Sequence, residues 1–111
     1  MTIAPADGPN NADWFAHGVF DVREIMTRAG GGAGSIELLG SWSSGSEQND
    51  FSGPIKHENG TMFLLTLEPE AIDEALELVM SEVRRLVRLY RVDVKEVHLI
   101  EIPADRLKFS V

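Results

Sequence analysis

The chain of 111 residues contains no cysteine. Disulfide bonds, thiolate nucleophiles and cysteine-ligated zinc or iron–sulfur sites are therefore excluded. No stretch approaches the run of about 18 apolar residues that a membrane span needs, and the opening MTIAPADGPNNAD lacks the basic and apolar regions of a signal peptide. We therefore expect a cytoplasmic protein whose stability comes from packing.

Positive charge is also scarce. Ten Lys and Arg stand against eighteen Asp and Glu, so the net charge is -8. A field of this sign repels phosphate backbones and anionic membrane surfaces, and we expect neither nucleic acid nor membrane as a partner. The composition, 43% hydrophobic and 25% charged, is typical of a globular chain that can bury a core.

Residues 1–11 are rich in Pro, Gly, Asn and Asp, which predicts a mobile tail followed by a single α+β domain over 12–111. The segment ADWFAHGVFDVREIMTRAGGG then allows two interpretations. Apolar residues at helical spacing indicate one helix over about 12–29, ended by Gly30. Alternatively, Asp21 caps a shorter helix and residues 14–20 form a strand. Gly18 would cost the longer helix about 1 kcal/mol relative to Ala, which slightly favours the second interpretation.

The rest of the chain reads as strands around one long helix. SIELLGSWS predicts a strand and SSGSEQNDFSG a polar loop. PIKHENGTMFLLTL predicts a hairpin, because Asn59 and Gly60 suit the two positive-φ positions of a type I′ turn. PEAIDEALELVMSEVRRLVRLYRV predicts a long amphipathic helix, and strands follow over 94–102 and 106–111. The core face of that helix should comprise Ile72, Leu76, Val79, Met80, Val83, Leu86, Val87 and Tyr90.

This order predicts an α+β fold: a mixed β-sheet of four to five strands with one short and one long helix on one face. The strands at 62–67 and 94–102 should run parallel, since a helix joins them by a right-handed crossover. The order resembles the βαββαβ pattern of ferredoxin-like folds, so we expect a ferredoxin-like or related two-layer sandwich.

The glycine-rich GGGAGS, residues 30–35, invites comparison with phosphate-binding loops. It lacks both the lysine of a Walker loop and the third glycine of the dinucleotide fingerprint, and it follows a helix instead of opening one. We interpret Gly30 as a helix end and the other glycines as a joint at a pocket rim or subunit boundary.

No catalytic residue is identified from the sequence. The three histidines lack the spacing of metal ligands, so we expect no metal and no cofactor. His98 falls among apolar residues and is most simply a buried histidine satisfied by one hydrogen bond. The alternative is a small dimeric enzyme or ligand-binding domain with an apolar pocket between sheet and helices, lined by His98, Tyr90 and Trp42.

Leu78 and Leu89 align on the long helix, three turns apart and away from its core face. Either the short helix packs on them or they contact another chain, and a C2 dimer is the commonest form of such contact. The sequence therefore predicts a non-catalytic interaction or regulatory module, self-associating, with Leu78 and Leu89 at the interface.

Overall fold

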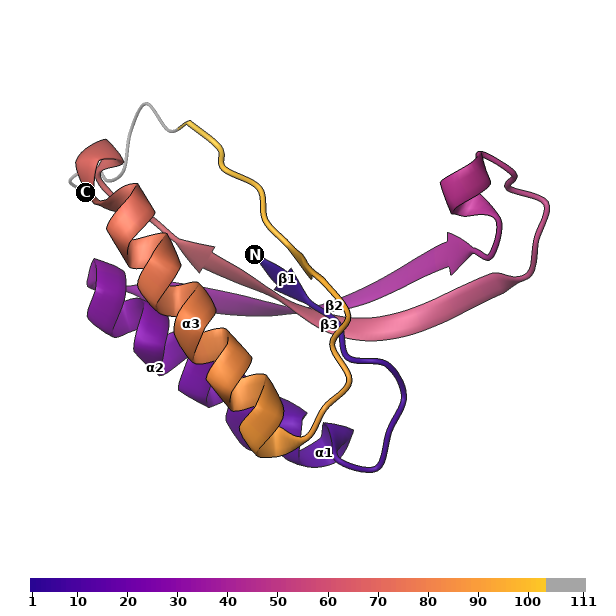
Figure 1. Ribbon diagram of the computed structural model, residues 1–111, viewed down its shortest axis with the longest axis horizontal. Helices are drawn as coiled ribbons and strands as arrows, with labels where there is room; N and C mark the ends of the chain where they lie inside the picture. The colour runs from indigo at the N-terminus through magenta and orange to yellow at the C-terminus, as the bar shows by residue number, and fades with distance from the viewer. Residues whose placement is uncertain (104–111) are drawn as a thin grey trace, which may run out of the picture.

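The computed structural model describes residues 1–103 and has two layers, a four-stranded sheet and a pair of long helices (Figure 1). The sheet order is β2-β3-β1-β4. The strands are β1 (Thr2–Ile3), β2 (Ala33–Ser43), β3 (Ile55–Leu65) and β4 (Val97–His98), and the helices are α1 (Asn11–Asp13), the π-helix η1 (Trp14–Gly18), α2 (Val19–Gly30) and α3 (Ile72–Tyr90). Short 3-10 turns occupy Ser46–Gln48 and Pro69–Ala71. The predicted α+β two-layer sandwich is confirmed.

All neighbouring strands in the described sheet are antiparallel, so the expected mixed sheet is wrong. β3 and β4 do point the same way, as the crossover through α3 requires, but they do not touch. β1 lies between them, and its Thr2 pairs with Met62 on one side and His98 on the other. The specifically ferredoxin-like order is not confirmed.

The first residues form the middle of the sheet and not a mobile tail. Ile3 is fully buried, at 0% exposure, between Thr61 and Val97. The Met1 amino group donates to the Phe63 carbonyl at 3.0 Å, and its burial lowers the pKa of that amine. A two-residue strand is too short to leave an alternating pattern, so the polar composition around it misled the sequence interpretation.

Residues 11–30 form one continuous helix, of which η1 is the middle part (Figure 1). The longer-helix interpretation is correct, and the strand over 14–20 with a cap at Asp21 is wrong. Position 18 of this helix requires glycine, because a Cβ there would lie 2.5 Å from the indole of Trp14, which is fully buried. Burial of the indole therefore outweighs the helix-propensity cost of the glycine. Gly31, with φ of 88°, adopts the left-handed conformation that ends α2, one residue later than expected.

The predicted hairpin turn at Asn59–Gly60 is wrong, because both residues lie inside the continuous strand β3. A Cβ on Gly60 would lie 3.0 Å from the Cβ of Ala4 and 3.1 Å from the carbonyl oxygen of Ile3. The glycine is needed so that the chain leaving β1 can pass close to β3. The actual hairpin joins β2 to β3 through residues 44–54, and its arm extends beyond the helices (Figure 1).

The long helix α3 buries Ala75, which the expected core face does not include, and leaves the expected Ile72, Leu76 and Met80 only partly buried. Of the expected residues, Val79, Val83 and Leu86 are buried. These residues meet Ile3, Phe63 and the buried face of α2, which is Val22 and Met26. The strand expected over 94–102 is much shorter, since pairing is confined to β4. The strand expected over 106–111 lies outside the described residues. Among the helices of residues 1–103, none combines the length and apolar character needed to cross a bilayer.

Candidate functional site

The three residues of the predicted pocket lie in different parts of the molecule. Trp42 stands on β2, one edge strand of the sheet, where Lys56 Nζ lies 5.3 Å from the indole centroid. His98 stands on β4, at the opposite edge. Tyr90 ends α3 and packs edge-on against Trp14, with ring centroids 5.9 Å apart. These positions do not assemble a pocket from the three side chains.

His98 is not a core residue. Its strand neighbour Val97 pairs with buried Ile3 and packs against the core, so alternation turns His98 to the other face. The imidazole is 69% exposed, and its Nε2 lies 3.1 Å from Glu96 Oε1. Alternation along the strand separates His98 from Val97, but only the tertiary structure shows that the face of His98 is the exposed one.

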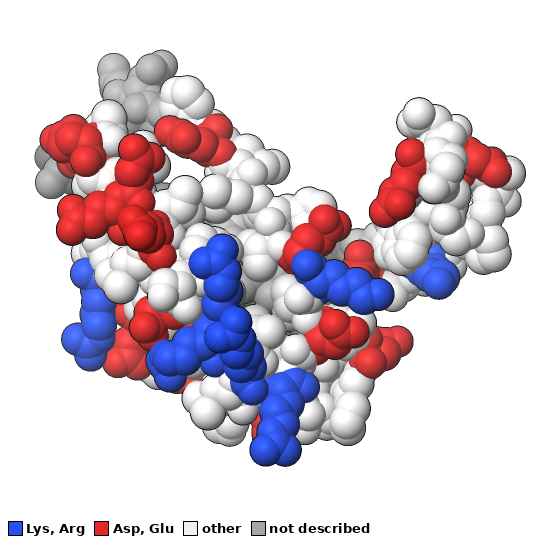
Figure 2. Space-filling view, in the orientation of Figure 1, with Lys and Arg blue, Asp and Glu red and all other residues white. Residues whose placement is uncertain are grey.

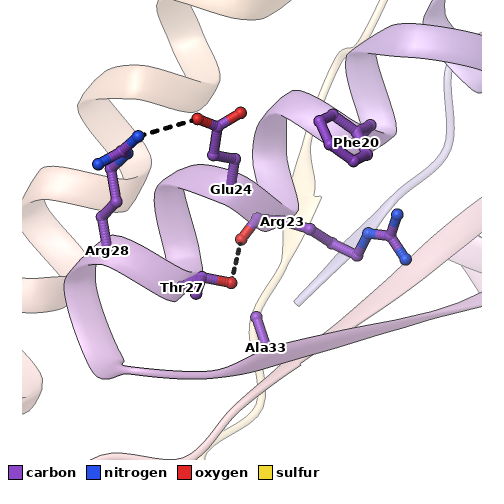
Figure 3. A pocket seen from close by; sticks show the side chains of 6 residues that line it. All are labelled: Phe20, Arg23, Glu24, Thr27, Arg28 and Ala33. Atoms are coloured by element: carbon purple, nitrogen blue, oxygen red, sulfur yellow. Dashed lines mark hydrogen bonds and ion pairs between the residues drawn. The ribbon is translucent and has the colours of Figure 1, made fainter.

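A shallow hollow of about 500 Å³ lies between α2 and the start of β2 (Figure 3). Two of its polar side chains pair with each other, Arg28 with Glu24 at 3.0 Å, and Thr27 Oγ1 donates to the backbone carbonyl of Arg23 at 2.8 Å. Arg23 lies over the ring of Phe20, 5.7 Å from its centroid. Among the residues that line this hollow, no nucleophile is hydrogen-bonded to a base. Within residues 1–103, no three His, Asp or Glu side chains are grouped as metal ligands.

Most of the large apolar side chains of β2 point away from the helices, and Leu39 is the exception. Ser35 pairs with buried Phe63, and directly opposed residues share a face, so Ser35, Glu37 and Ser41 lie on the helix side. The other side carries Ile36, Leu38 and Trp42, which are 39–50% exposed. Met62 and Leu64 of β3 lie on the same side, opposite Ile36 and Gly34. We call this surface the outer face: Ile36, Leu38, Trp42, Met62 and Leu64.

The predicted leucine row, Leu78 and Leu89, is exposed on α3 at 49% and 63%. Both stay accessible although α2 packs against α3, so α2 does not cover the row. Glu82 and Arg85 lie between the two leucines on the same stripe of the helix, and their side chains pair at 2.9 Å. Sequence reasoning missed this ion pair, although its i,i+3 spacing is visible in the chain.

Charge is divided along α3. Acidic side chains gather over its N-terminal end and basic ones over its C-terminal half (Figure 2). This distribution matches the helix dipole, which favours anions at the N-terminus and cations at the C-terminus.

Comparison of the chain with models of protein families, with curated proteins and with solved structures found no match.

Proposed function

We propose that the protein is a non-catalytic interaction module that docks on other protein chains through exposed apolar surfaces. The observation that carries this proposal is the inverted pattern of β2. An antiparallel sheet with one solvated face normally presents polar residues to water and apolar ones to its helices. Here Ser35, Glu37 and Ser41 face the helix side together with Leu39, whereas Ile36, Leu38 and Trp42 face outward.

Ile36, Leu38, Met62 and Leu64 of the outer face are close neighbours on two paired strands. Ile36 pairs directly with Met62, and Leu64 follows two positions along the same face of β3. Leu38 and Trp42 extend the surface along β2 toward the arm. Charged side chains on this side of the two strands are confined to the arm, where Lys56 and Glu58 carry opposite signs. Such a surface favours contact with an apolar surface of another protein over contact with a nucleic acid or an anionic membrane.

Two adjacent leucines of β2 provide the test, because they share a residue type and lie on opposite faces. Protein purified from its own host under mild conditions should have a native mass above that of the 12.2 kDa chain. Leu38→Lys places a charge on the outer face and should lower the native mass by releasing the partner docked there. Leu39→Lys, on the helix side of the arm, is the matched control and should leave the complex intact. Equal native masses for the wild type and Leu38→Lys would contradict the proposal.

A further inference from the structure

The leucine row matches itself about a two-fold axis. The midpoint between Leu78 and Leu89 is also the midpoint between Glu82 and Arg85. At 100° per residue the four side chains share a stripe about 60° wide, and at 1.5 Å per residue the leucines stand about 16 Å apart. The row is therefore a leucine at each end with an acid and a base between them.

We propose that α3 packs antiparallel against α3 of a second copy of this chain, about a two-fold axis through that midpoint. The axis places Leu78 of one copy opposite Leu89 of the other, and Glu82 opposite Arg85. The inference rests on the proposed function, for which it names one partner and one surface. Both contacts occur twice in the dimer, since a two-fold interface uses the same patch on each copy.

Charge complementarity selects a second copy as the occupant of the row. An antiparallel arrangement brings the acidic N-terminal half of α3 against the basic C-terminal half of its partner (Figure 2). The row itself is neutral, with one Glu and one Arg, although each chain has a net charge of -8. The attraction between the two copies therefore comes from the charges at the contact. These charges are closer together than the Debye length of about 8 Å at physiological salt, so salt screens them little. The antiparallel helix dipoles act in the same direction.

The packing geometry is that of an ordinary helix pair. In many bundles, antiparallel helices pack with their axes about 8–10 Å apart and cross at shallow angles. At such angles, side chains about 8 Å along the axis on either side of the crossing point are still in contact. Each leucine pair lies at about that distance from the midpoint and shields the central charges from water. Partial exclusion of water strengthens the Glu82–Arg85 contacts between copies relative to the same pair on an open surface.

Two single charge reversals test the inference when they are studied apart and then mixed. Glu82→Arg leaves two bases in the row, and Arg85→Glu leaves two acids, so each variant repels its own copy. We expect each to dissociate at least about tenfold more readily than the wild type by light scattering across a concentration series. Mixed in equal amounts, they should form a heterodimer, because each Arg then faces a Glu. The ion pair within each chain stays broken in the mixture, so only contacts between chains can restore assembly.

The ion pair of Glu24 and Arg28 on α2 provides a matched control. It is also exposed, with a separation of 3.0 Å, and lies outside the row. Glu24→Arg and Arg28→Glu should leave the dimer intact. Leu78→Glu with Leu89→Glu should abolish the dimer with circular dichroism unchanged.

Monomeric wild type at every concentration, or singles that stay monomeric when mixed, would overturn the dimer. The proposed function would still stand if Leu38→Lys, but not Leu39→Lys, released the host complex. If the dimer persisted in all the row variants, the row would not be its interface, and the outer face would remain the proposed docking surface.

Discussion

Tyr90 Oη donates a hydrogen bond to Asp21 Oδ2 at 2.5 Å and so joins the last turn of α3 to α2. The two residues are 69 positions apart in the chain. Trp14 packs against the same phenol ring, so this contact fixes how the two helices meet. The hydrogen bond to Asp21 raises the pKa of Tyr90, because an ionised phenolate could no longer donate it and would face a carboxylate.

The first prediction concerns alkaline pH. Because the pKa of Tyr90 is raised above its ordinary value of about 10, the protonated phenol stabilises the folded state below that pH. This stabilisation is lost as the pH rises through the folded-state pKa. Tyr90 is the only tyrosine of the chain, so phenolate absorbance follows this group alone. The titration midpoint should lie above that of the urea-unfolded chain, and Asp21→Asn should lower it. Equal midpoints for the folded and unfolded chains would show that the hydrogen bond does not form.

The second prediction concerns Gly18. A Cβ at this position lies 2.5 Å from the Trp14 ring, so Gly18→Ala should destabilise the fold by about 1–3 kcal/mol through overpacking, despite the higher helix propensity of alanine. A Cβ added at Gly32 would meet no atom within 4 Å, and Gly32→Ala is the control, with an effect within about 0.5 kcal/mol. Urea unfolding measures both. A stabilised Gly18→Ala would mean that Trp14 packs elsewhere.

The third prediction separates a central strand from a tail at the start of the chain. Ile3 is fully buried, so Ile3→Ala should cost about 2–5 kcal/mol of unfolding free energy. Ile55 is the control, since it is 60% exposed at the start of β3 and Ile55→Ala should change stability by less than about 0.5 kcal/mol. If the two substitutions had equally small effects, β1 would not be part of the sheet.

The fourth prediction concerns His98. Because its side chain is exposed and pairs with exposed Glu96, His98→Ala should change the free energy of unfolding by less than about 0.5 kcal/mol. Thermal unfolding at neutral pH is a sufficient measurement. If the free energy of unfolding fell by about 2 kcal/mol or more, as for the removal of a buried, hydrogen-bonded side chain, His98 would be a core residue after all.

The helices were largely predictable, because helical periodicity is a local signal that repeats over many residues. The buried face of α3 follows its apolar spacing, and the exposure of Leu78 and Leu89 follows from the same wheel. The candidate site was only partly predictable. The exposure of Leu78 and Leu89 could be predicted from the helix pattern, and their role at an interface stays a prediction. The outer face and the partners of Tyr90 could not be predicted, because both depend on contacts between distant segments.

Sequence alone determined the fold class, the long helix and the alternation of β2. Tertiary structure decided which side of β2 meets the helices, because alternation fixes two faces without saying which is buried. It also decided that Asn59 and Gly60 lie within a strand and not in a turn. Gly60 is needed there because the chain after β1 passes too close for a side chain. Gly18 shows the same principle: its cost to the helix is local, and the Trp14 burial that offsets it exists only in the folded core.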